Sequence, residues 1–400
     1  MNNLEVGFVV NTQISNNVGR RAKKLVETLS DISPNLDIRW VSLFEEKMSS
    51  KLVDMIKLLF SRVKVIHIIE PFGPSFLFLI PFRIFGKRII YQTGDVHYKN
   101  AELSGQLGPK FLLFRLSERC HYFFSNKILV GSVGHESFLY SELNFSREHV
   151  AKVNYFGCPD IPSEWSKNAD KHSQEDQLIL DLEHKIAGKF VILYSSSLRV
   201  LKIGRDYVPR GWEIPFIVNH LVSEWHDDVV GIILGDGPGK RLIERISENL
   251  GVRDQILTPG NVSREHYFDV LSFGSIFFVE SLDHITYSIM YPSKISDYTY
   301  IGKPFIWSFN PESISWDDYP LLVRPAKYFE KFFDGNQKYV FEAALLIHRF
   351  INNNSFKTKC FEKFNTIKNG FKDWDEIAKD VLVIYEKFKP TNYIKDSEWR

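Results

Sequence analysis

The sequence has few cysteines and no long hydrophobic run. Its 400 residues include only three cysteines, Cys120, Cys158 and Cys360, which are far apart and odd in number. This pattern argues against a disulfide framework or a cysteine-based zinc site and favours a reducing compartment. No apolar run reaches the roughly 18 residues that a membrane-spanning helix needs. The first residues, MNNLEVGFVVN, place an acidic residue before a short apolar run, which favours a first strand over a signal peptide.

An excess of charge of one sign is also missing. The chain carries 50 lysines and arginines against 49 acidic residues, a formal net charge of +1, which argues against a general nucleic-acid-binding protein. The sequence offers no convincing pair of carboxylates for glycoside hydrolysis and no acidic metal-binding motif. We therefore expect neither a metal ion nor a resident cofactor.

The sequence does contain ample core and a regular alternation of elements. Apolar residues make up 44% of the chain, and its length suggests two or three domains. In the first half, strand-like apolar runs alternate with helical patterns, which predicts a parallel sheet with helices on both faces. The predicted strands are LEVGFVVN, DIRWVSLF, VKVIHII, KRIIYQT, KILVGS and AKVNYFG.

A second series of the same kind begins near Lys189. Its predicted strands are KFVILYSSS, DVVGIILGDG, DQILTPG, GSIFFVES, KPFIWSF and LLVRP. Between the two series, DIPSEWSKNADKHSQEDQ is polar and lacks periodicity, which indicates a linker. We therefore predict one Rossmann-like α/β domain over residues 1–159, a linker and the start of the next domain over 160–188, and a second Rossmann-like domain over 189–372. Ligands of such sheets bind outside the carboxyl ends of the strands.

The stretch GDGPGK, Gly235 to Lys240, joins a predicted strand to a predicted helix. Its glycines permit backbone angles that other residues avoid, and unpaired amides at a helix start can hold an anion. The spacing does not fit a P-loop, which needs a hydroxyl residue where Arg241 stands, or a dinucleotide fingerprint, which needs a third glycine where Lys240 stands. A phosphate-binding turn and a plain tight turn both remain open.

Several motifs follow this turn in a fixed order. GDGPGKRLIERISENLGVRDQILTPGNVSREHYFDVLSFGSIFFVES is followed by YPSKISDYTYIGKPFI. This series resembles the nucleotide-sugar domain of the glycosyltransferase B fold, most closely the large retaining family 4. NNVGRRAKKLVETL is similar to the first loop and helix of such enzymes, and DWDEIAKDVLVIYEKF to the terminal helix that crosses back to the first domain.

The resemblance implies two Rossmann-like domains facing across a cleft, with the acceptor side in the first domain and residues 373–400 as the crossover helix and tail. It also implies a UDP- or GDP-linked sugar donor as substrate, held by the second domain. Asp297 stands where the family has a glutamate that hydrogen-bonds ribose hydroxyls, and Ser293 and Lys294 offer amides to the diphosphate. The other donor-binding candidates are Asn17, Gly235, Gly237, Asn261, Val262, His284 and Thr286.

The sequence departs from the family pattern at two positions of the second domain. Ile289 stands where the family often has a first glutamate, eight positions before Asp297, and the nearby acids Glu280 and Asp283 have the wrong spacing. We therefore expect the loop DHITYSIM to supply the sugar contact instead. Ser197 stands where the family's phosphate-binding arginine usually falls. The loop that follows is rich in cations, and fixed cations stabilise a leaving diphosphate. We therefore predict catalytic roles for Arg199, Arg210 and Lys202, with a solvated basic loop as the alternative.

The first domain shows two further departures. Asn16 and Asn17 replace the family's paired glycines, and asparagine tolerates left-handed backbone angles better than most residues. After the strand RIIYQT, the position of a family histidine corresponds to Gly94-Asp95, with His97 two residues on. We predict that His97 approaches the sugar or the acceptor. A surface or capping histidine is the alternative.

Two stretches raise the question of a membrane. FLFLIPFRIFGKR, residues 76–88, is aromatic and aliphatic and ends basic, and GPKFLLFRLSERCHYFF, residues 108–124, has similar character. The first stretch fits a core helix under a sheet. The alternative is a helix lying in a lipid surface, with Arg83, Lys87 and Arg88 near anionic headgroups.

The sequence thus predicts an enzyme that moves a sugar from a nucleotide sugar to a hydroxyl of a glycan or lipid-linked acceptor. Family resemblance adds retention of configuration and catalysis without a metal ion. The scattered cysteines favour a cytoplasmic location, and residues 76–88 and 108–124 suggest peripheral contact at the inner membrane face. Ile289 and Ser197 motivate the alternative, a non-catalytic nucleotide-sugar-binding or scaffold subunit of a glycan-assembly complex. A sugar-nucleotide epimerase on the same fold is a third hypothesis.

Overall fold

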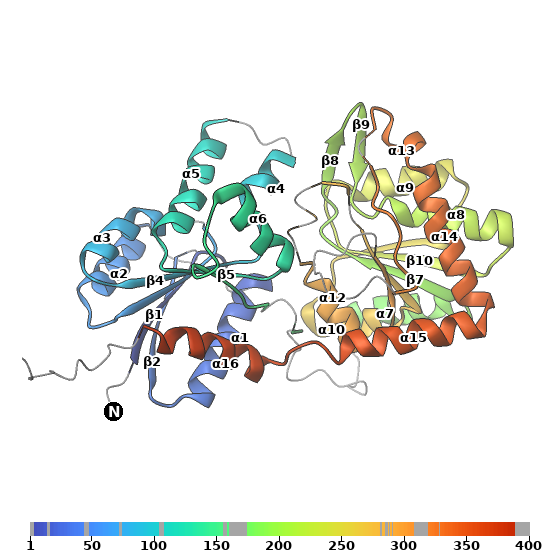
Figure 1. The fold of residues 1–400 in the computed structure, drawn as a ribbon. Coiled ribbons are helices and arrows are strands. Elements are labelled where there is room, and N and C mark those ends of the chain that lie inside the picture. Colours follow the sequence, from blue (N-terminus) through green and yellow to red (C-terminus); the bar gives the residue numbers. More distant parts are fainter. Residues whose placement is uncertain are drawn as a thin grey trace, which may run out of the picture. The chain divides into compact units, whose positions relative to one another are not determined.

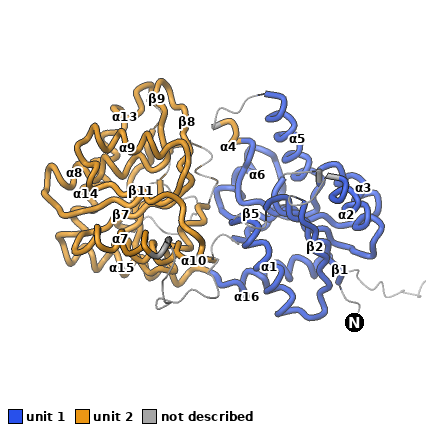
Figure 2. The backbone as a smooth tube through the Cα atoms, turned by 180° about the vertical axis from the view of Figure 1, so that it is seen from behind, with its two compact units in different colours: residues 1–98, 107–155, 372–400 blue, residues 99–106, 156–371 orange. Residues whose placement is uncertain are grey.

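The chain forms two parallel sheets, each covered by helices on both faces (Figure 1). The structure, a computed structural model, describes residues 4–13, 17–43, 48–71, 74–103, 108–154, 158–159, 174–280, 282–284, 287, 289, 291–307, 319–327 and 329–388. Residues 1–98, 107–155 and 372–400 form one compact unit, and residues 99–106 and 156–371 form the other (Figure 2). The predicted class, two Rossmann-like α/β domains, is confirmed.

The first unit contains a six-stranded parallel sheet in the order β2-β1-β3-β4-β5-β6. All five residues of β3 are buried, as expected for a strand with helices on both faces. The strands are β1 (Leu4–Val10), β2 (Leu36–Ser42), β3 (Val65–Ile69), β4 (Arg88–Thr93), β5 (Lys127–Val130) and β6 (Val150–Lys152).

Helices cover both faces of this sheet. In Figure 1, α1 and α16 lie on one side of it, and α3, α5 and α6 lie on the other. The predicted helix near residues 76–85 is present as η1 followed by α3. The helices are α1 (Asn17–Ile32), α2 (Met48–Phe60), η1 (Pro74–Phe78), α3 (Leu79–Ile84), α5 (Pro109–Phe124), α6 (Val133–Leu143) and α16 (Trp374–Glu386). Helix α4 (His97–Leu103) begins in the first unit, but its residues from Lys99 on are assigned to the second.

The terminal helix α16 returns to the first unit, as predicted. It begins with a capping box in which the Asp373 side chain accepts from the Glu376 amide and the Glu376 side chain accepts from the Asp373 amide. Its buried face packs on α1. The Tyr385 hydroxyl lies 2.6 Å from Nδ1 of His67, so the helix is bonded to the central strand β3.

The second unit contains a five-stranded parallel sheet in the order β11-β10-β7-β12-β13. Strand β10 is buried throughout, which fits its unbroken aliphatic sequence VVGIIL. The strands are β7 (Phe190–Ser195), β10 (Val229–Leu234), β11 (Ile256–Gly260), β12 (Ile276–Val279) and β13 (Phe305–Trp307).

Two groups of helices pack around this second sheet. Helices α8 and α14 contact each other, and α10 contacts both α7 and α12. The elements are α7 (Gln174–Ile186), α8 (Glu213–Trp225), α9 (Lys240–Asn249), η2 (Arg253–Gln255), α10 (Arg264–Ser272), α12 (Lys294–Ile301), α13 (Phe332–Gly335), α14 (Gln337–Asn352) and α15 (Asn354–Lys368).

Three local predictions were wrong. The cationic segment after β7 is not a loop but an antiparallel hairpin of β8 (Val200–Ile203) and β9 (Asp206–Pro209), whose alternating apolar residues point inward. The predicted strand LLVRP makes only an isolated bridge, between Leu322 and Trp307. Helix α7 begins at Gln174, inside the predicted linker, because its apolar residues Ile179 and Leu182 become buried.

Both sheets have a point where the strand order reverses direction. In the first, β2 lies on one side of β1 and β3 on the other; in the second, β10 lies on one side of β7 and β12 on the other. Loops diverge at such a switch point and leave a crevice at the carboxyl ends of the strands, where ligands of this class of sheet bind. The ends of β1 and β3, and those of β7 and β12, are therefore the places to look for a site.

Candidate functional site

Two cations and one carboxylate meet at the switch point of the second sheet. Glu280 directly follows β12 and is buried. Arg210 donates to its Oε1 from Nε at 2.8 Å and again from a terminal nitrogen. Lys294, the first residue of α12, donates to its Oε2 at 2.8 Å. The carboxylate thus holds Arg210 and Lys294 together. The sequence predicted a diphosphate contact for both, through the side chain of Arg210 but through the backbone amide of Lys294.

A glycine directly after Arg210 lets the backbone pass close to Tyr194 of β7. Gly211 has a φ of 85°, the left-handed region that favours glycine. A Cβ there would lie 2.8 Å from Cε1 of Tyr194, so a side chain would collide with the ring. The ammonium of Lys294 lies 4.2 Å from the centroid of the same ring. Tyr194, near the end of β7, therefore lies under the Lys294 ammonium and against Gly211, the residue after Arg210.

Burial and the neighbouring charges shift the pKa values of Glu280 and Lys294. Burial alone would raise the pKa of Glu280, but Arg210 and Lys294 lower it to about 2. Burial lowers the pKa of Lys294 to about 8, although Glu280 opposes that shift. Near neutral pH the three groups therefore carry two positive charges and one negative charge. The net charge of +1 suits a bound anion.

A second carboxyl group, that of Glu213, is buried beside the cluster in the first turn of α8. Its Oε2 has no hydrogen-bond partner among the residues that the structure describes. Burial, followed by the charge of Glu280, raises the pKa of Glu213 to about 8. At neutral pH its carboxyl group is therefore largely protonated, and it does not cancel the positive charge of the cluster.

Asp297, the predicted ribose ligand, shares a helix face with Lys294. The two residues are three positions apart on α12, so their side chains lie on neighbouring parts of one face. The Asp297 side chain is buried, and its Oδ1 lies 3.8 Å from a terminal nitrogen of Arg264, on α10. The Arg264 guanidinium also lies over the rings of Tyr267 and Phe268, at 4.9 and 4.7 Å from their centroids. Asp297 therefore lies beside a cation that is itself packed on two aromatic rings.

The GDGPGK turn is hydrogen-bonded to the loop after β7, because the Leu198 amide donates to the Asp236 carbonyl at 2.9 Å. The amide of Gly235 donates to the Gly260 carbonyl at 2.9 Å, and the amide of Gly237 to Oδ1 of Asp236 at 2.8 Å. A Cβ on Gly235, whose φ is 133°, would lie 1.9 Å from the Ser196 carbonyl oxygen. These glycines are thus required for close backbone packing. Since both amides already donate within the protein, a donor contact at Gly235 and Gly237 stays a prediction.

The structure does not bring the other predicted cations to the cluster. Arg199 and Lys202 are exposed at the hairpin, and neither forms an ion pair with any residue that the structure describes. Arg205 is also exposed and pairs with Glu330 at 2.5 Å. Arg210 directly follows the hairpin, and unlike the other three its side chain is only 23% exposed. Only Arg210, of these four cations, contacts Glu280.

The remaining candidates of the second unit are placed as follows. Asn261 and Val262 directly follow the edge strand β11, and Asn261 is exposed. Ser293 precedes the first turn of α12, where its carbonyl accepts from the Ser296 hydroxyl at 2.7 Å. Burial lowers the pKa of His284, so its ring is neutral near pH 7. Thr286 lies outside the described residues, and Ile289 is buried.

A second polar cluster lies at the switch point of the first sheet. Asn11, directly after β1, donates to the carbonyl of Glu70, directly after β3, at 2.5 Å. Glu70 is buried and has a φ of 66°, a left-handed angle that is strained for glutamate. Its carboxylate bonds Nε2 of His97. Strained residues of this kind often occur in functional sites.

The first turn of α4 orients His97. Glu118, from α5, accepts the amides of His97 and Tyr98 at 2.9 and 2.8 Å and so satisfies the start of α4. Burial alone would lower the pKa of His97, but Glu70 raises it to about 9, so the ring is a cation at neutral pH. His97 is therefore suited to donate a hydrogen bond, not to accept a proton. Asn17, at the start of α1, accepts from Nε of the buried Arg21 at 3.0 Å.

Sequence reasoning missed Glu70, Glu118 and Glu213 and rejected Glu280. Glu280 was set aside because its spacing to Asp297 does not fit the family motif. A positional rule would have found two of these residues, because Glu70 and Glu280 each directly follow a strand beside a switch point. Glu118 and Glu213 lie in helices, and nothing in the sequence marks them as buried.

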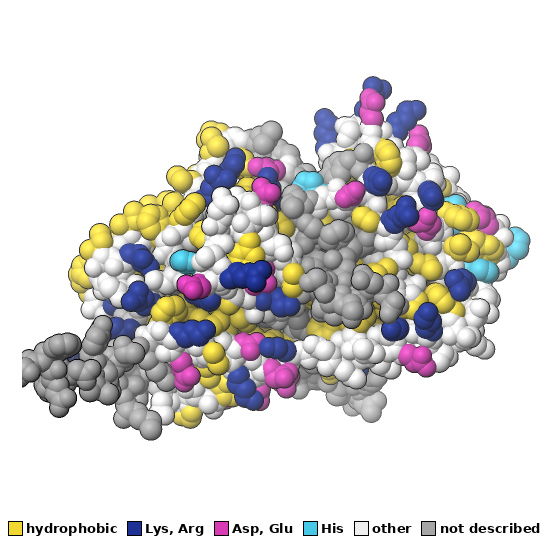
Figure 3. All heavy atoms as spheres, in the orientation of Figure 1, with side chains coloured by type: hydrophobic (Ala, Val, Ile, Leu, Met, Phe, Trp, Pro, Cys, Tyr) yellow, Lys and Arg dark blue, Asp and Glu magenta, His cyan; other side chains and the backbone are white. Residues whose placement is uncertain are grey.

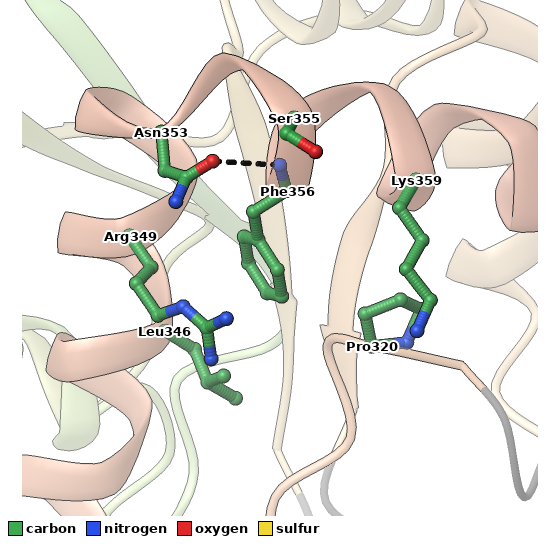
Figure 4. Close-up of a pocket in the computed structure, with 7 residues that line it drawn as sticks. All are labelled: Pro320, Leu346, Arg349, Asn353, Ser355, Phe356 and Lys359. Carbon is green, nitrogen blue, oxygen red and sulfur yellow. Dashed lines mark hydrogen bonds between the residues drawn. The ribbon is translucent and has the colours of Figure 1, made fainter.

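A separate open pocket lies between α14 and α15 (Figure 4). None of its lining residues follows a strand of the sheet. Oδ1 of Asn353 accepts from the amide of Phe356 at 2.9 Å, so the start of α15 is already capped. The Arg349 guanidinium lies 4.4 Å from the centroid of the Phe356 ring. Its lining residues are Pro320, Leu346, Arg349, Asn353, Ser355, Phe356 and Lys359.

Comparison with known proteins identifies the fold. No protein-family model and no curated protein sequence matches the chain. Sucrose-phosphate synthase from Thermosynechococcus elongatus has a TM-score of 0.63 at 13% identity, over 96% of this chain and 98% of that one. The lipopolysaccharide outer core galactosyltransferase WaaB has a TM-score of 0.53 at 13% identity, over 90% and 98%. UDP-GlcNAc 2-epimerase from Neisseria meningitidis, bound to UDP-GlcNAc, has a TM-score of 0.52 at 9% identity, over 96% and 100%.

These identities are low, so the likeness is one of fold. Each match spans nearly the whole of both chains, including both sheets. The chain therefore adopts the glycosyltransferase B fold that its motifs resemble.

Proposed function

We propose that the protein is a glycosyltransferase that moves a sugar from a UDP- or GDP-linked donor to a hydroxyl of a glycan or lipid-linked acceptor. The proposal includes retention of configuration, as in family 4, catalysis without a metal ion, and a cytoplasmic location. One observation carries it: Arg210 and Lys294 converge on Glu280 at the switch point of the second sheet. Two solved structures of the same fold are named as a sucrose-phosphate synthase and a galactosyltransferase, which supports the assignment.

The cluster suits the charge that develops during glycosyl transfer. The bond between the sugar's anomeric carbon and the diphosphate oxygen breaks, and its electron pair leaves with the diphosphate. The acceptor oxygen bonds the anomeric carbon, and the acceptor's proton leaves with the diphosphate. Fixed cations stabilise the growing negative charge more in the transition state than in the bound donor. Arg210 and Lys294 supply this charge in the proposal, which is why it needs no metal ion.

Glu280 is a positioning residue in this proposal. Its two oxygens hold Arg210 and Lys294 in fixed directions, so the cations need no reorganisation when the diphosphate arrives. Asp297, on the same face of α12 as Lys294, would accept hydrogen bonds from the ribose hydroxyls. For that contact, the hydroxyls have to approach a carboxylate that already faces Arg264 at 3.8 Å.

A UDP-sugar epimerase is the second candidate. The fold match to an epimerase bound to UDP-GlcNAc favours it, because such an enzyme also holds a nucleotide diphosphate. The two functions differ in what happens to the sugar. A transferase forms a new glycoside only when an acceptor is present, whereas an epimerase returns an isomerised sugar without one.

The test combines binding with product analysis. Calorimetry with UDP and GDP should show binding of one of them, weakened at least about tenfold by Lys294→Ala, since a lost charge-assisted contact costs about 1.5–3 kcal/mol. Arg205→Ala, which removes an exposed cation, is the matched control and should bind like the wild type. Donors are then incubated with and without an acceptor extract, and the products are examined by NMR.

The outcomes separate the candidates. A new glycoside with the donor's anomeric configuration supports the proposal, and one with inverted configuration removes the retaining assignment. An isomerised sugar formed without acceptor identifies an epimerase. Binding of neither nucleotide would overturn both candidates.

A further inference from the structure

The exposed hydrophobic side chains of the described residues are concentrated in the first unit. Eighteen large hydrophobic residues are exposed, and eleven of them lie on α2, α5 or the segment from η1 to Phe85. Figure 3 shows such side chains along the edge of the first unit. A soluble monomer rarely exposes a contiguous apolar patch of this kind without a partner for it.

The exposed residues follow the helical period on each element. On α2 they are Val53, Ile56 and Phe60, and on η1–α3 they include Leu77, Ile80 and Ile84. Spacings of three and four residues place each set on one face of its helix. Phe60 is 68% exposed and Ile84 76%, so these are not core residues that reach the surface at one edge.

Helix α5 extends the same face. Its exposed apolar residues are Leu112, Leu113, Leu116 and Phe123, and Leu112 is 64% exposed. Helix α3 contacts α5, and η1 contacts both α2 and α5. The rings of Phe60 and Phe85 meet edge to face, with centroids 5.2 Å apart, which joins α2 to the end of α3. The eleven residues therefore lie on packed neighbours, and we call them the apolar face.

The charges around the apolar face are almost all positive. Lys57, Arg83 and Lys110 are exposed, and so are Arg62 and Arg88, next to the ends of these elements. From residue 74 to 88 the sequence has no acidic residue. The acids of α2 and α5 are Asp54, which pairs with Lys57 at 2.9 Å, and Glu118, which is fully buried. A basic rim around an apolar face is complementary to an anionic lipid surface.

Lys87 does not belong to this rim, which corrects the expectation from the sequence. Its side chain is buried, and its ammonium donates to the carbonyls of Ser61 and Val63 at 2.6 and 2.7 Å. These hydrogen bonds connect Lys87, next to the start of β4, to the turn after α2. Arg83 and Arg88, the two other cations expected near headgroups, are exposed.

We propose that the apolar face and its basic rim dock the protein on the surface of an anionic bilayer. No described helix is long and apolar enough to cross a membrane, so the contact is peripheral. A second copy of the chain fits this face less well. A two-fold interface would set the same cations against each other, and like charges repel. The inference goes beyond the proposed chemistry, since docking needs neither donor nor acceptor.

Flotation of the full chain tests the proposal. The protein is mixed with vesicles of phosphatidylcholine alone, or with vesicles that also contain phosphatidylglycerol, and is spun through a density gradient. We expect flotation with the anionic vesicles and much less with the neutral ones. Ile84→Glu combined with Leu112→Glu should lower the partition coefficient at least about tenfold, because each change puts a charge where an apolar side chain enters the interface.

Matched variants separate this effect from general damage. Leu180→Glu combined with Leu345→Glu places the same charges at exposed leucines of the second unit and should float like the wild type. Arg83→Gln and Lys57→Gln should each lower binding to anionic vesicles about fivefold and leave binding to neutral vesicles unchanged, since a basic residue near the surface contributes about 1 kcal/mol. All substituted side chains are exposed, and circular dichroism should be used to check that each variant folds.

Three results would overturn the proposal. The wild type could fail to float with anionic vesicles, or the Ile84 and Leu112 variant could float as the wild type does. Light scattering could instead show a dimer that this variant dissociates, which would assign the apolar face to a second copy of the chain.

Discussion

Replacement of Arg210 is the sharpest test of the candidate site. Its guanidinium makes two hydrogen bonds to Oε1 of Glu280 and is 23% exposed. A unit charge about 4 Å from another contributes about 4 kcal/mol at the effective dielectric constant of a partly exposed site. If about half a charge develops on the leaving oxygen, the transition state gains about 2 kcal/mol over the bound donor. Arg210→Ala should therefore lower turnover at saturating donor about 30-fold.

The assay is release of nucleotide diphosphate at saturating donor, which does not require a known acceptor. Arg210→Lys should recover part of the lost rate, because a point charge remains but the two-pronged guanidinium contact is gone. Arg205→Ala is the matched control on the neighbouring hairpin, where the side chain is exposed. Arg199→Ala should cost less than Arg210→Ala, because Arg199 is exposed and does not contact Glu280.

Folding has to be checked separately, because Arg210→Ala leaves Glu280 with Lys294 as its remaining partner in the cluster. Thermal unfolding of each variant provides this check. A folded Arg210→Ala protein that turns over within about twofold of the wild type, a difference below about 0.4 kcal/mol, would refute the reasoning. The diphosphate would then have to be held elsewhere than at the switch point of the second sheet.

Three further predictions concern donor binding, backbone strain and pH. Asp297→Ala should weaken donor binding about 10- to 150-fold, the equivalent of about 1.5–3 kcal/mol; unchanged affinity in calorimetry would remove Asp297 from the site. Gly235→Ala should lower the unfolding free energy by at least about 2 kcal/mol and more than Gly188→Ala, which has the same sign of φ but open space around it; equal losses in urea denaturation would contradict the packing argument. Because Glu70 raises the pKa of His97 to about 9, the stability from this pair is full below about pH 6.5 and is lost as the pH rises through about 9. His97→Gln should flatten that part of the stability profile, and a profile parallel to that of the wild type would count against the pairing.

The sequence was sufficient for the fold because its signals are local. Long aliphatic runs such as VVGIIL at β10 become buried strands, and the turn GDGPGK has glycines where a Cβ would collide with backbone. The capping box formed by Asp373 and Glu376 likewise marks the start of α16 with residues only three positions apart. Prediction was wrong for short segments whose structure depends on whether they pair with another strand. LLVRP has strand composition but finds only an isolated bridge, and the cationic segment folds into a hairpin that needs a pairing between strands.

The candidate site was harder to predict from the sequence, because it depends on which strand ends lie next to each other in the sheet. Motif spacing measures distance along the chain, and by that measure Glu280 stood in the wrong place. Its contact with Arg210 joins residues 70 positions apart, and the contact of Glu70 with His97 joins residues 27 apart. Such pairs follow from sheet order and from backbone angles like the φ of Glu70, which no local pattern encodes. Composition did indicate the cations, but not which of them would be buried.

The return of α16 has a consequence for how the protein is made. The buried face of this helix, including Ile377, Ala378 and Val381, packs on α1 in the first unit. The ribosome makes most of that unit first, but it adds α16 only at the end of the chain. Until residues 374–386 emerge, that surface of α1 and the buried ring of His67 stay without their cover. The whole second unit is synthesised in the interval. In a nascent chain stalled before Asp373, the face of α1 that α16 covers is therefore still exposed to solvent. The first unit can finish folding only after the second half of the protein has been translated.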